Sequence, residues 1–394
     1  MLSLDSTVIK LCHLNSAKTT YYGYKSMKNN VQPIVKPTVD KYILDNMVCF
    51  RVAGQLMEVD DPDGVITSII TNMDGINTLD DIISKVLSDK PFTTQEQLND
   101  IVCDMNDALL IEDSCLNHNG ILSEYDAIRW SRNINFFGSF CRMENNKFLY
   151  QKKLQDTKVA LLGIGGLGTH IIYDLVALGV KKIIAVDCDK VELSNLNRQI
   201  LYSETDIGKN KVLAAQERID QFYKSNEVEF VEMKISSAED IRNVIRGRDI
   251  VICVADKPRM RIQGWLNEAC VKEQIPYIHG GLDVKRAMFC TVIPGISGCT
   301  ECWANTVIDN EDSTYTLIEK DLNTDFSTSA PAPAIVTFVS TLTGHMLTDF
   351  LKLATGIANP VSLGKLIEIP FDTMRLDVAE EWDKHKDCPV CSAK

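Results

Sequence analysis

Long apolar runs are missing from this sequence. No stretch approaches the about 18 apolar residues that a membrane-spanning helix needs. The first residues, MLSLDSTVIKLCHLNSAKTT, contain no basic start, no long apolar stretch and no small-residue cleavage site, so we expect no secretory signal. Both absences predict a protein without a membrane partner.

Positive charge is also in short supply. The 41 basic residues face 54 acidic ones, which leaves a formal net charge of −13. Such a surface repels phosphate backbones, so we expect no nucleic-acid partner. The 13 cysteines are odd in number and mostly lie singly in apolar segments, which predicts reduced thiols and a cytoplasmic protein.

The composition that remains is that of a globular protein. Apolar residues make up 45% and charged residues 24%, which excludes a disordered or fibrous chain. A chain of 394 residues predicts two or three domains. Changes in pattern divide it into a loosely ordered lead-in, a small α+β unit, a connector and a large α/β domain: 1–41, 42–115, 116–150 and 151–394.

The small unit is predicted to contain two strands followed by three helices. Met47–Val52 and Gln55–Val59 are short strand-like runs on either side of Ala53-Gly54, a pair that suits a hairpin turn. Thr78 is placed to cap a helix, and Thr94 with Gln97 is a capping-box pattern that begins another. Pro33 and Pro37 are expected to prevent regular structure in the lead-in.

The large domain alternates apolar strands with helices. The runs 159–162, 183–186 and 250–254 are separated by helix-like stretches at 169–178 and 211–222. Continuous apolar strands between helices predict a parallel sheet covered on both faces.

A glycine-rich turn follows the first of these strands. Gly163, Gly165, Gly166 and Gly168 lead directly into a helix, where backbone can approach a pyrophosphate and the helix N-terminus attracts negative charge. The second strand ends at Asp187, where a ribose hydroxyl is commonly held, and Asp189 follows. This combination predicts nucleotide binding; the alternative is a turn that only lets the helix pack on the sheet.

Further polar residues favour ATP over NAD as the nucleotide. Arg198, Lys211 and Asp256 lie downstream, and hydride transfer has no evident use for them. Attack at an α-phosphate requires cations that neutralise the negative charge developing on the phosphate, and a carboxylate that binds Mg²⁺. Taken singly, Arg198 and Lys211 would be read as solvated surface charges.

These motifs together resemble the E1-like adenylating enzymes. The GxGGxG, DxD, NLxRQ and GKxK motifs and a strand-end aspartate occur in the family's order, and the resemblance covers about residues 125–394. It implies a homodimeric, Rossmann-like doubly wound α/β domain that binds ATP and Mg²⁺ and adenylates a carboxylate. Position by position, the resemblance implies that the glycines line the nucleotide and that Asp187 binds the ribose, with Asp189 beside it. It also implies that Asp256 holds Mg²⁺. The residues that it implies contact phosphates are Asn195, Arg198, Gln199 and Lys211.

A segment of the connector resembles another motif of this family. Arg129-Trp130-Ser131-Arg132-Asn133 is similar to its RYxRQ-like segment, whose second arginine enters the partner subunit's site. In this chain Trp replaces Tyr and Asn replaces Gln. The resemblance implies that Arg132 completes the site of a second protomer.

Two CxxC pairs predict a structural zinc site. Cys299 and Cys302 form one pair and Cys388 and Cys391 the other, and four thiolates in two knuckles make a closed tetrahedral Zn²⁺ site. A redox CxxC and buried free thiols are the alternatives.

The crossover segment at about 303–333 contains no cysteine. Family members that pass an acyl group to a thiol use a cysteine in that segment, and Cys270 and Cys290 are expected to fill core space instead. We therefore expect no thioester intermediate.

The small unit is similar to the PqqD-like, winged-helix-like element that recognises leader peptides in ribosomal peptide biosynthesis. The shared features are the strand pair around Arg51 and Glu58, the turns at 61–64 and 73–75, and a final helix ending at Ile111. In that family a leader adds as an extra strand at the sheet edge. The alternative is a module used for dimer contacts or packing.

Taken together, the chain resembles the E1-like enzymes that mature the microcin C7 and pantocin A precursors. That resemblance implies ATP-dependent adenylation of a ribosomal precursor peptide, with the leader bound by the N-terminal unit. Three other functions remain open: activation of a ubiquitin-like sulfur carrier, a leader-binding scaffold without catalysis, and an NAD-dependent dehydrogenase.

Overall fold

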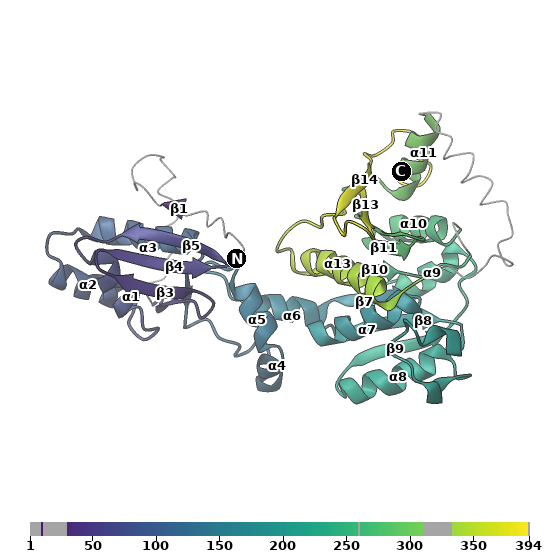
Figure 1. Cartoon of the computed structure of the whole chain (residues 1–394), viewed down its shortest axis with the longest axis horizontal. Coiled ribbons are helices and arrows are strands. Elements are labelled where there is room, and N and C mark those ends of the chain that lie inside the picture. The colour runs from purple at the N-terminus through teal and green to yellow at the C-terminus, as the bar shows by residue number, and fades with distance from the viewer. Residues whose placement is uncertain (1–8, 11–29, 259–260, 310–332, 393–394) are drawn as a thin grey trace. The chain divides into compact units, whose positions relative to one another are not determined.

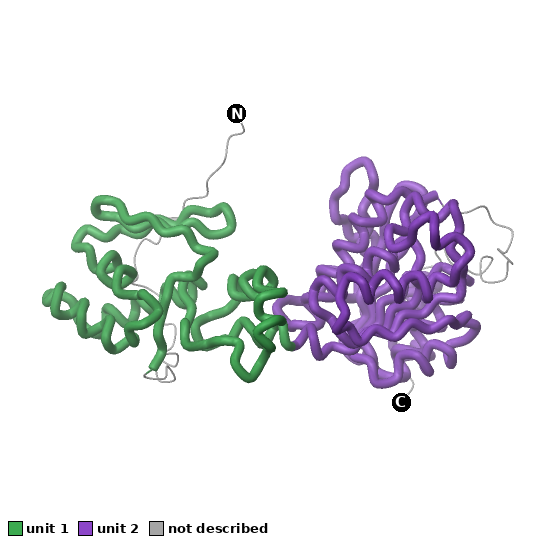
Figure 2. The backbone as a smooth tube through the Cα atoms, turned by 90° about the horizontal axis from the view of Figure 1, so that it is seen from below, with its two compact units in different colours: residues 1–152 green, residues 153–394 purple. Residues whose placement is uncertain are grey.

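The structure, a computed structural model, describes residues 9–10, 30–258, 261–309 and 333–392. It divides the chain into two units, residues 1–152 and 153–394, which are drawn in different colours in Figure 2. Each unit has a hydrophobic core of its own.

The N-terminal unit combines short strands with six helices in the residues described. Its strands are β1 (Ile9–Lys10), β2 (Pro33–Val35), β3 (Asp40–Leu44), β4 (Met47–Val52), β5 (Gln55–Asp60) and β6 (Ile111–Asp113). Its helices are α1 (Val65–Asn72), α2 (Leu79–Asp89), α3 (Gln95–Asp107), α4 (Glu124–Arg129), α5 (Ser131–Gly138) and α6 (Phe148–Asp156), the last of which crosses into the second unit.

Two tight turns build the main sheet of this unit, which has the order β1-β5-β4-β3 (Figure 1). Asn46 lies in the turn between β3 and β4 with φ 64°. Ala53 and Gly54 lie between β4 and β5 with φ 49° and 78°. Positive φ angles at such positions match the twist of a two-residue hairpin, so the hairpin expected at Ala53-Gly54 is confirmed.

The expectation that residues before 42 lack regular structure is wrong for residues 30–41. β2 includes Pro33 and pairs with β6, where the register joins Ile34 to Glu112. Lys36 is buried, and its ammonium donates a hydrogen bond to the carbonyl of Cys141 at 2.6 Å. Proline is tolerated at the first residue of a short strand, which the argument from Pro33 overlooked.

Local capping explains where the helices of this unit begin. Thr78 and Asp81 form a capping box at α2, and Thr94 and Gln97 form one at α3, as the sequence predicts. At α1 the carboxylate of Asp61 accepts hydrogen bonds from the backbone N–H groups of Ile66 and Thr67 at 2.9 and 2.8 Å. The three helices therefore begin at defined residues, and their apolar faces cover the sheet core.

The second unit contains the large domain. Its strands are β7 (Lys158–Leu162), β8 (Lys182–Asp187), β9 (Glu227–Glu232), β10 (Ile250–Cys253), β11 (Tyr277–Leu282), β12 (Arg286–Val292), β13 (Lys365–Pro370) and β14 (Asp377–Glu381). Its α-helices are α7 (Gly166–Leu178), α8 (Lys211–Phe222), α9 (Ala238–Ile245), α10 (Arg261–Glu273), α11 (Thr300–Asp309) and α13 (Val336–Thr355), and two 3-10 turns are η2 (Leu193–Asn195) and η3 (Glu204–Asp206).

The sheet of the second unit has the order β14-β13-β12-β11-β10-β7-β8-β9 (Figure 1). The five strands from β11 to β9 are parallel, and their order is that of a doubly wound nucleotide-binding sheet. The Rossmann-like fold class is therefore confirmed. The three strands expected to be parallel are parallel, and β12, β13 and β14 add an antiparallel extension beyond β11.

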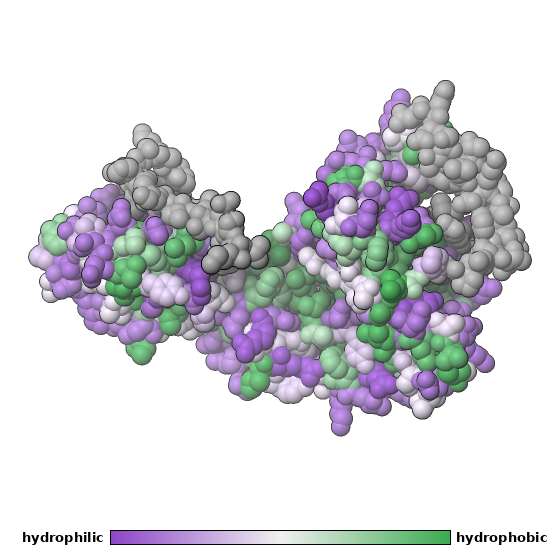
Figure 3. Space-filling view, viewed as in Figure 1, coloured by the Kyte–Doolittle hydropathy of each residue, from purple (hydrophilic) through white to green (hydrophobic). Residues whose placement is uncertain are grey.

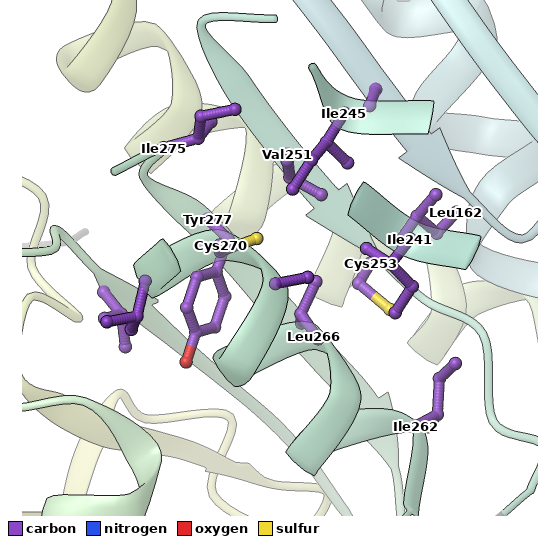
Figure 4. Close-up of a cluster of buried hydrophobic side chains, with 14 of the residues drawn as sticks. Leu162, Ile241, Ile245, Val251, Cys253, Ile262, Leu266, Cys270, Ile275 and Tyr277 are labelled. Carbon is purple, nitrogen blue, oxygen red and sulfur yellow. The ribbon is translucent and has the colours of Figure 1, made fainter. Parts of the chain in front are cut away.

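Helices cover both faces of this sheet. α7 packs against α8 and α13 on one face, and α9 packs against α10 on the other. Figure 4 shows part of the buried cluster on the second face, where Leu266 and Cys270 of α10 lie close to Tyr277. This packing fixes β7 and β10 as central neighbours, the position from which successive helices leave to opposite faces.

A search of the described helices finds none that combines the length and the hydropathy required to cross a bilayer.

Candidate functional site

The glycine turn joins β7 to α7 and requires the absence of side chains. Gly163 has φ 98°, and a Cβ built there would lie 2.9 Å from the backbone nitrogen of Ala255. A Cβ at Gly168 would lie 2.0 Å from the carbonyl oxygen of Gly163. These two glycines therefore let the turn close tightly against the end of β10.

The other two glycines line the beginning of α7. Gly165 precedes the helix, and within the described residues no side chain caps its first turn. The first N–H groups of α7 are thus available for an anion, which the helix dipole also favours. Cβ positions at Gly165 and Gly166 would face Gln199 and Arg198, at 4.0 and 3.6 Å from their nearest side-chain atoms.

Two acidic residues and a lysine meet at the end of β8. Asp187 accepts hydrogen bonds from the backbone N–H of Ile164 at 2.7 Å and of Asp189 at 2.8 Å. The Lys211 ammonium lies 2.9 Å from an oxygen of Asp189 and 4.0 Å from one of Asp187. Lys211 is therefore not the solvated surface charge that a single lysine would suggest, since its side chain is only 6% exposed.

Arg198 belongs to the loop that follows β8. Its guanidinium donates hydrogen bonds to the carbonyl of Ser194 at 3.0 Å and to the side chain of Asn197 at 2.8 Å. Asn195 is buried, and its side-chain oxygen accepts from the backbone of Glu192 at 3.1 Å, which closes the turn η2. The loop thus presents Arg198 beside Gly166 at the start of α7.

Gln199 has a buried polar atom that lacks a partner. The residue is 3% exposed, and its Oε1 has no hydrogen bond among the described residues. An unpaired buried oxygen is costly, so this side chain fits a position where a ligand supplies the missing donor.

Sequence reasoning missed Tyr202, whose side chain forms a hydrogen bond to the glycine turn. The tyrosine is buried, and its hydroxyl donates to the carbonyl of Ile164 at 2.8 Å. Burial, followed by the charges of Asp187, Asp189 and Asp206, raises its pKa well above the usual value, so the hydroxyl stays a donor. In the sequence, the only indication that Tyr202 belongs to the site was its position three residues after Gln199.

Asp256 follows β10 at the same edge of the sheet. It is exposed, and it comes directly after Ala255, the residue that contacts Gly163. The structure therefore places Asp256 near the glycine turn, at the carboxyl end where doubly wound sheets bind their ligands.

Arg132 lies in the other unit. It is exposed in the first turn of α5, two residues after the buried Trp130. Arg129 stacks on the Trp130 ring, with its guanidinium carbon 5.6 Å from the ring centroid.

The four cysteines of the two CxxC pairs converge. All four sulfur atoms lie within 4.8 Å of one another, and three of the sulfur pairs are 3.7, 3.6 and 3.3 Å apart. A tetrahedral Zn²⁺ with bonds of about 2.3 Å would place its sulfur ligands about 3.8 Å apart. The cluster fits a closed structural zinc site, and it anchors the end of the chain at 388–391 to α11.

Cys270 and Cys290 lie in the sheet core, as expected (Figure 4 shows Cys270). Burial raises the pKa of Cys290 to about 12 and that of Cys270 well above its usual value. Neither thiol is suited to act as a nucleophile.

The assembled site has the parts that a triphosphate needs. A tight glycine turn and an open helix N-terminus can receive phosphate oxygens, Arg198 and Lys211 supply positive charge, and Asp256 offers a carboxylate. Such groups stabilise charge that develops on a phosphate under attack.

Comparison with known proteins agrees with this chemistry. The model of the ThiF family matches residues 130–390. The sulfur carrier protein ThiS adenylyltransferase of Bacillus subtilis is 32% identical over 250 residues, which are 62% of this chain and 67% of that protein.

Solved structures extend the likeness to most of the chain. E. coli MccB with AMPCPP and MccA has a TM-score of 0.72 and 24% identity, over 92% of this chain and 99% of MccB. The microcin C7 biosynthetic enzyme MccB in complex with N-formylated MccA has a TM-score of 0.69 and 25% identity, over 91% and 99%. With the family match covering more than half of the sequence, the chain belongs to the ThiF family and is an ATP-dependent adenylating enzyme.

Proposed function

We propose that this enzyme adenylates a carboxylate, or an amide-bearing C-terminus, on a ribosomally made precursor peptide during peptide antibiotic maturation. The observation that carries the proposal is the likeness to MccB, solved with MccA, over 91% of this chain and therefore over most of the N-terminal unit as well. A carrier-activating enzyme has no evident need for a separate peptide-binding unit.

The N-terminal unit offers sheet edges to which a leader can add. On one edge, Ile9 and Lys10 of the chain itself pair in parallel with Met57 and Glu58 of β5. The edge at β5 is therefore able to pair with an added strand. On the other edge β3 exposes Tyr42, Ile43 and Leu44, and Figure 3 shows hydrophobic surface over these strands. Backbone pairing would supply affinity for the leader, and side-chain contacts would supply selectivity among leader sequences. These features support a PqqD-like role in leader recognition.

The chain's residues then act on the two substrates at the glycine turn. The turn and α7 hold the triphosphate, and Arg198 and Lys211 stabilise charge on the α-phosphate. Asp187 holds the ribose, and Asn195 and Gln199 complete the phosphate contacts. Asp256 would hold Mg²⁺, which supplies charge neutralisation for the departing pyrophosphate. A peptide oxygen attacks the α-phosphorus while the bond to the β-phosphate breaks, which yields the acyl-adenylate and pyrophosphate.

The activated peptide is then attacked without transfer to a cysteine. The described core thiols Cys270 and Cys290 are buried, and the sequence of the crossover segment at 303–333 contains no cysteine. Water, an amine, an amide nitrogen or a carbon nucleophile can attack directly. A C-terminal Asn amide nitrogen would displace AMP to give a cyclic imide. The imide nitrogen would then attack the α-phosphate of a second ATP with release of pyrophosphate, and opening of the ring by water would leave a phosphoramidate. A neighbouring Glu would instead allow condensation within the peptide.

A homodimer and a reducing compartment complete the proposal. Arg132 is exposed on α5, and we expect it to enter the site of a second protomer. The cysteines that the structure describes are all free, which supports a cytoplasmic enzyme.

Pyrophosphate release from the full chain tests this function. The probes are synthetic precursor peptides encoded by short reading frames beside the gene, and the matched variant is Asp256→Ala. We expect release with one peptide and none from the variant, which should keep the peptide affinity of the wild type in a fluorescence titration. Joint loss of catalysis and peptide affinity would contradict the division of labour between the two units.

A second candidate function is activation of a ubiquitin-like sulfur carrier. It is favoured by the 32% identity to the ThiS adenylyltransferase of Bacillus subtilis. Release with a carrier ending in Gly-Gly, and with no peptide, would establish that function instead. No release with any peptide or carrier would favour a leader-binding scaffold.

A further inference from the structure

A buried histidine connects the Arg198 loop to two helices of the second unit. His170 lies in α7 and is 7% exposed. Its Nε2 is 3.2 Å from the carbonyl oxygen of Arg198, and its Nδ1 is 3.3 Å from the hydroxyl of Ser340 in α13. One imidazole therefore joins three segments that are far apart in the sequence.

The partners determine which nitrogen carries the hydrogen. A carbonyl oxygen only accepts, so Nε2 must be protonated and must donate to Arg198. Nδ1 is then an acceptor, and the single hydrogen of the Ser340 hydroxyl is divided between Nδ1 and the carbonyl of Val336, which lies 3.1 Å from that hydroxyl. Burial lowers the pKa of His170, although the Arg198 carbonyl and Asp174 oppose this, so the neutral ring is favoured.

The contact to the backbone complements the contacts of the Arg198 side chain. The guanidinium is held by Ser194 and Asn197, which belong to the same loop and move with it. His170 instead belongs to α7, the helix whose first turn receives the phosphates. Its bond therefore fixes the loop relative to the phosphate site, whereas the bonds of the guanidinium do not.

We propose that His170 is a positioning residue, which holds the main chain of Arg198 so that the guanidinium stays beside the start of α7. The proposal rests on the proposed role of Arg198 at the phosphates. The imidazole neither transfers a proton nor touches the nucleotide, and its effect passes through Arg198 alone.

Two conservative variants separate this role from simple packing. The side-chain amide of glutamine reaches the place of Nε2, so His170→Gln can still donate to Arg198. The amide of asparagine reaches only the place of Nδ1, so His170→Asn can contact Ser340 but not Arg198. We expect His170→Gln to bind ATP like the wild type and His170→Asn to bind it roughly three- to tenfold more weakly, which is the range for one hydrogen bond.

ATP affinity is measured by titration calorimetry on the full chain, and thermal melting checks that each variant folds. Ser340→Ala is the matched control on the other side of the ring, and it should leave ATP affinity unchanged. Arg198→Ala combined with His170→Asn should bind no more weakly than Arg198→Ala alone, because both act through one guanidinium.

Equal ATP affinity in the glutamine and asparagine variants, whether unchanged or reduced, would overturn the proposal, and so would an additive double variant. ATP binding does not depend on which acyl substrate is used. A failure of the peptide assay with normal ATP binding would therefore affect the proposed function and not this inference.

Discussion

The Lys211 ammonium lies 2.9 Å from a carboxylate oxygen of Asp189, and the two side chains differ sharply in exposure. Lys211 is 6% exposed, whereas Asp189 is 63% exposed. The lysine is therefore held in place before any nucleotide arrives, by an acid that remains accessible to solvent. Little rotamer entropy is left for Lys211 to lose when a phosphate binds.

Lys211→Ala should reduce ATP–pyrophosphate exchange by about a hundredfold or more, because it removes a preorganised charge at the reacting phosphate. The matched control is Lys209→Ala. Lys209 lies two residues before Lys211 in the sequence. It forms ion pairs with Asp206 and Glu217, and its side chain is 41% exposed. Isotope exchange on both variants is the measurement, and similar losses would contradict a specific role for Lys211.

Gly168→Ala should abolish ATP binding and destabilise the second unit. The added Cβ would lie 2.0 Å from the carbonyl oxygen of Gly163, a backbone atom that no rotamer change can move. We expect a loss of about 1–3 kcal/mol in the free energy of unfolding, the usual cost of overpacking. Calorimetric titration with ATP and thermal melting are the measurements.

Gly344→Ala is the control for that substitution. Gly344 lies in α13 with open space around its Cβ position, so alanine should stabilise the helix by up to about 1 kcal/mol. A Gly168→Ala variant that melts and binds ATP like the wild type would show that the turn relaxes freely.

The nucleotide half of the fold could be predicted because its determinants are local. Continuous apolar runs define β7, β8 and β10, and the glycine turn follows β7 directly in the sequence. The last strand of the antiparallel extension, β14, has no such pattern. Four of the five residues of β14, DVAEE, are exposed, and in the N-terminal unit all five residues of β3 are exposed, so neither strand shows the alternation of a half-buried strand.

The site residues could be named from motifs, but their contacts could not. The approach of Gly163 to Ala255 joins segments 92 positions apart, and His170 meets Ser340 across 170 positions. Tyr202 and His170 lack a local pattern, because a buried polar side chain is revealed only by the partner that tertiary structure supplies.

Asp104→Asn should stabilise the N-terminal unit at neutral pH. Burial, followed by the charges of Asp100 and Asp107, raises the pKa of Asp104 in the folded state. Its raised pKa favours folding while the group is protonated, and this contribution is lost as the pH rises through the folded-state value. The melting temperature of the variant should exceed that of the wild type at pH 7, and the difference should vanish near pH 3.

Asp45→Asn, an exposed position in the turn between β3 and β4, should leave the pH dependence unchanged. Calorimetry from pH 3 to pH 8 compares the three proteins. A melting temperature of Asp104→Asn that stays parallel to that of the wild type across this range would refute the assignment.

Cys388→Ser should lose zinc and weaken the C-terminal part of the second unit. Its sulfur lies 3.6 Å from that of Cys299, so the substitution removes one of four donors and leaves the remaining thiols without a closed site. We expect about one zinc per wild-type chain by elemental analysis, a strongly reduced content in the variant, and a lower melting temperature, since metal binding and folding are coupled. Cys115→Ser, an exposed cysteine of the other unit, should keep both zinc and stability. A wild-type chain that contains no zinc, or that loses it to a chelator without any change in melting, would contradict the structural role of this cluster.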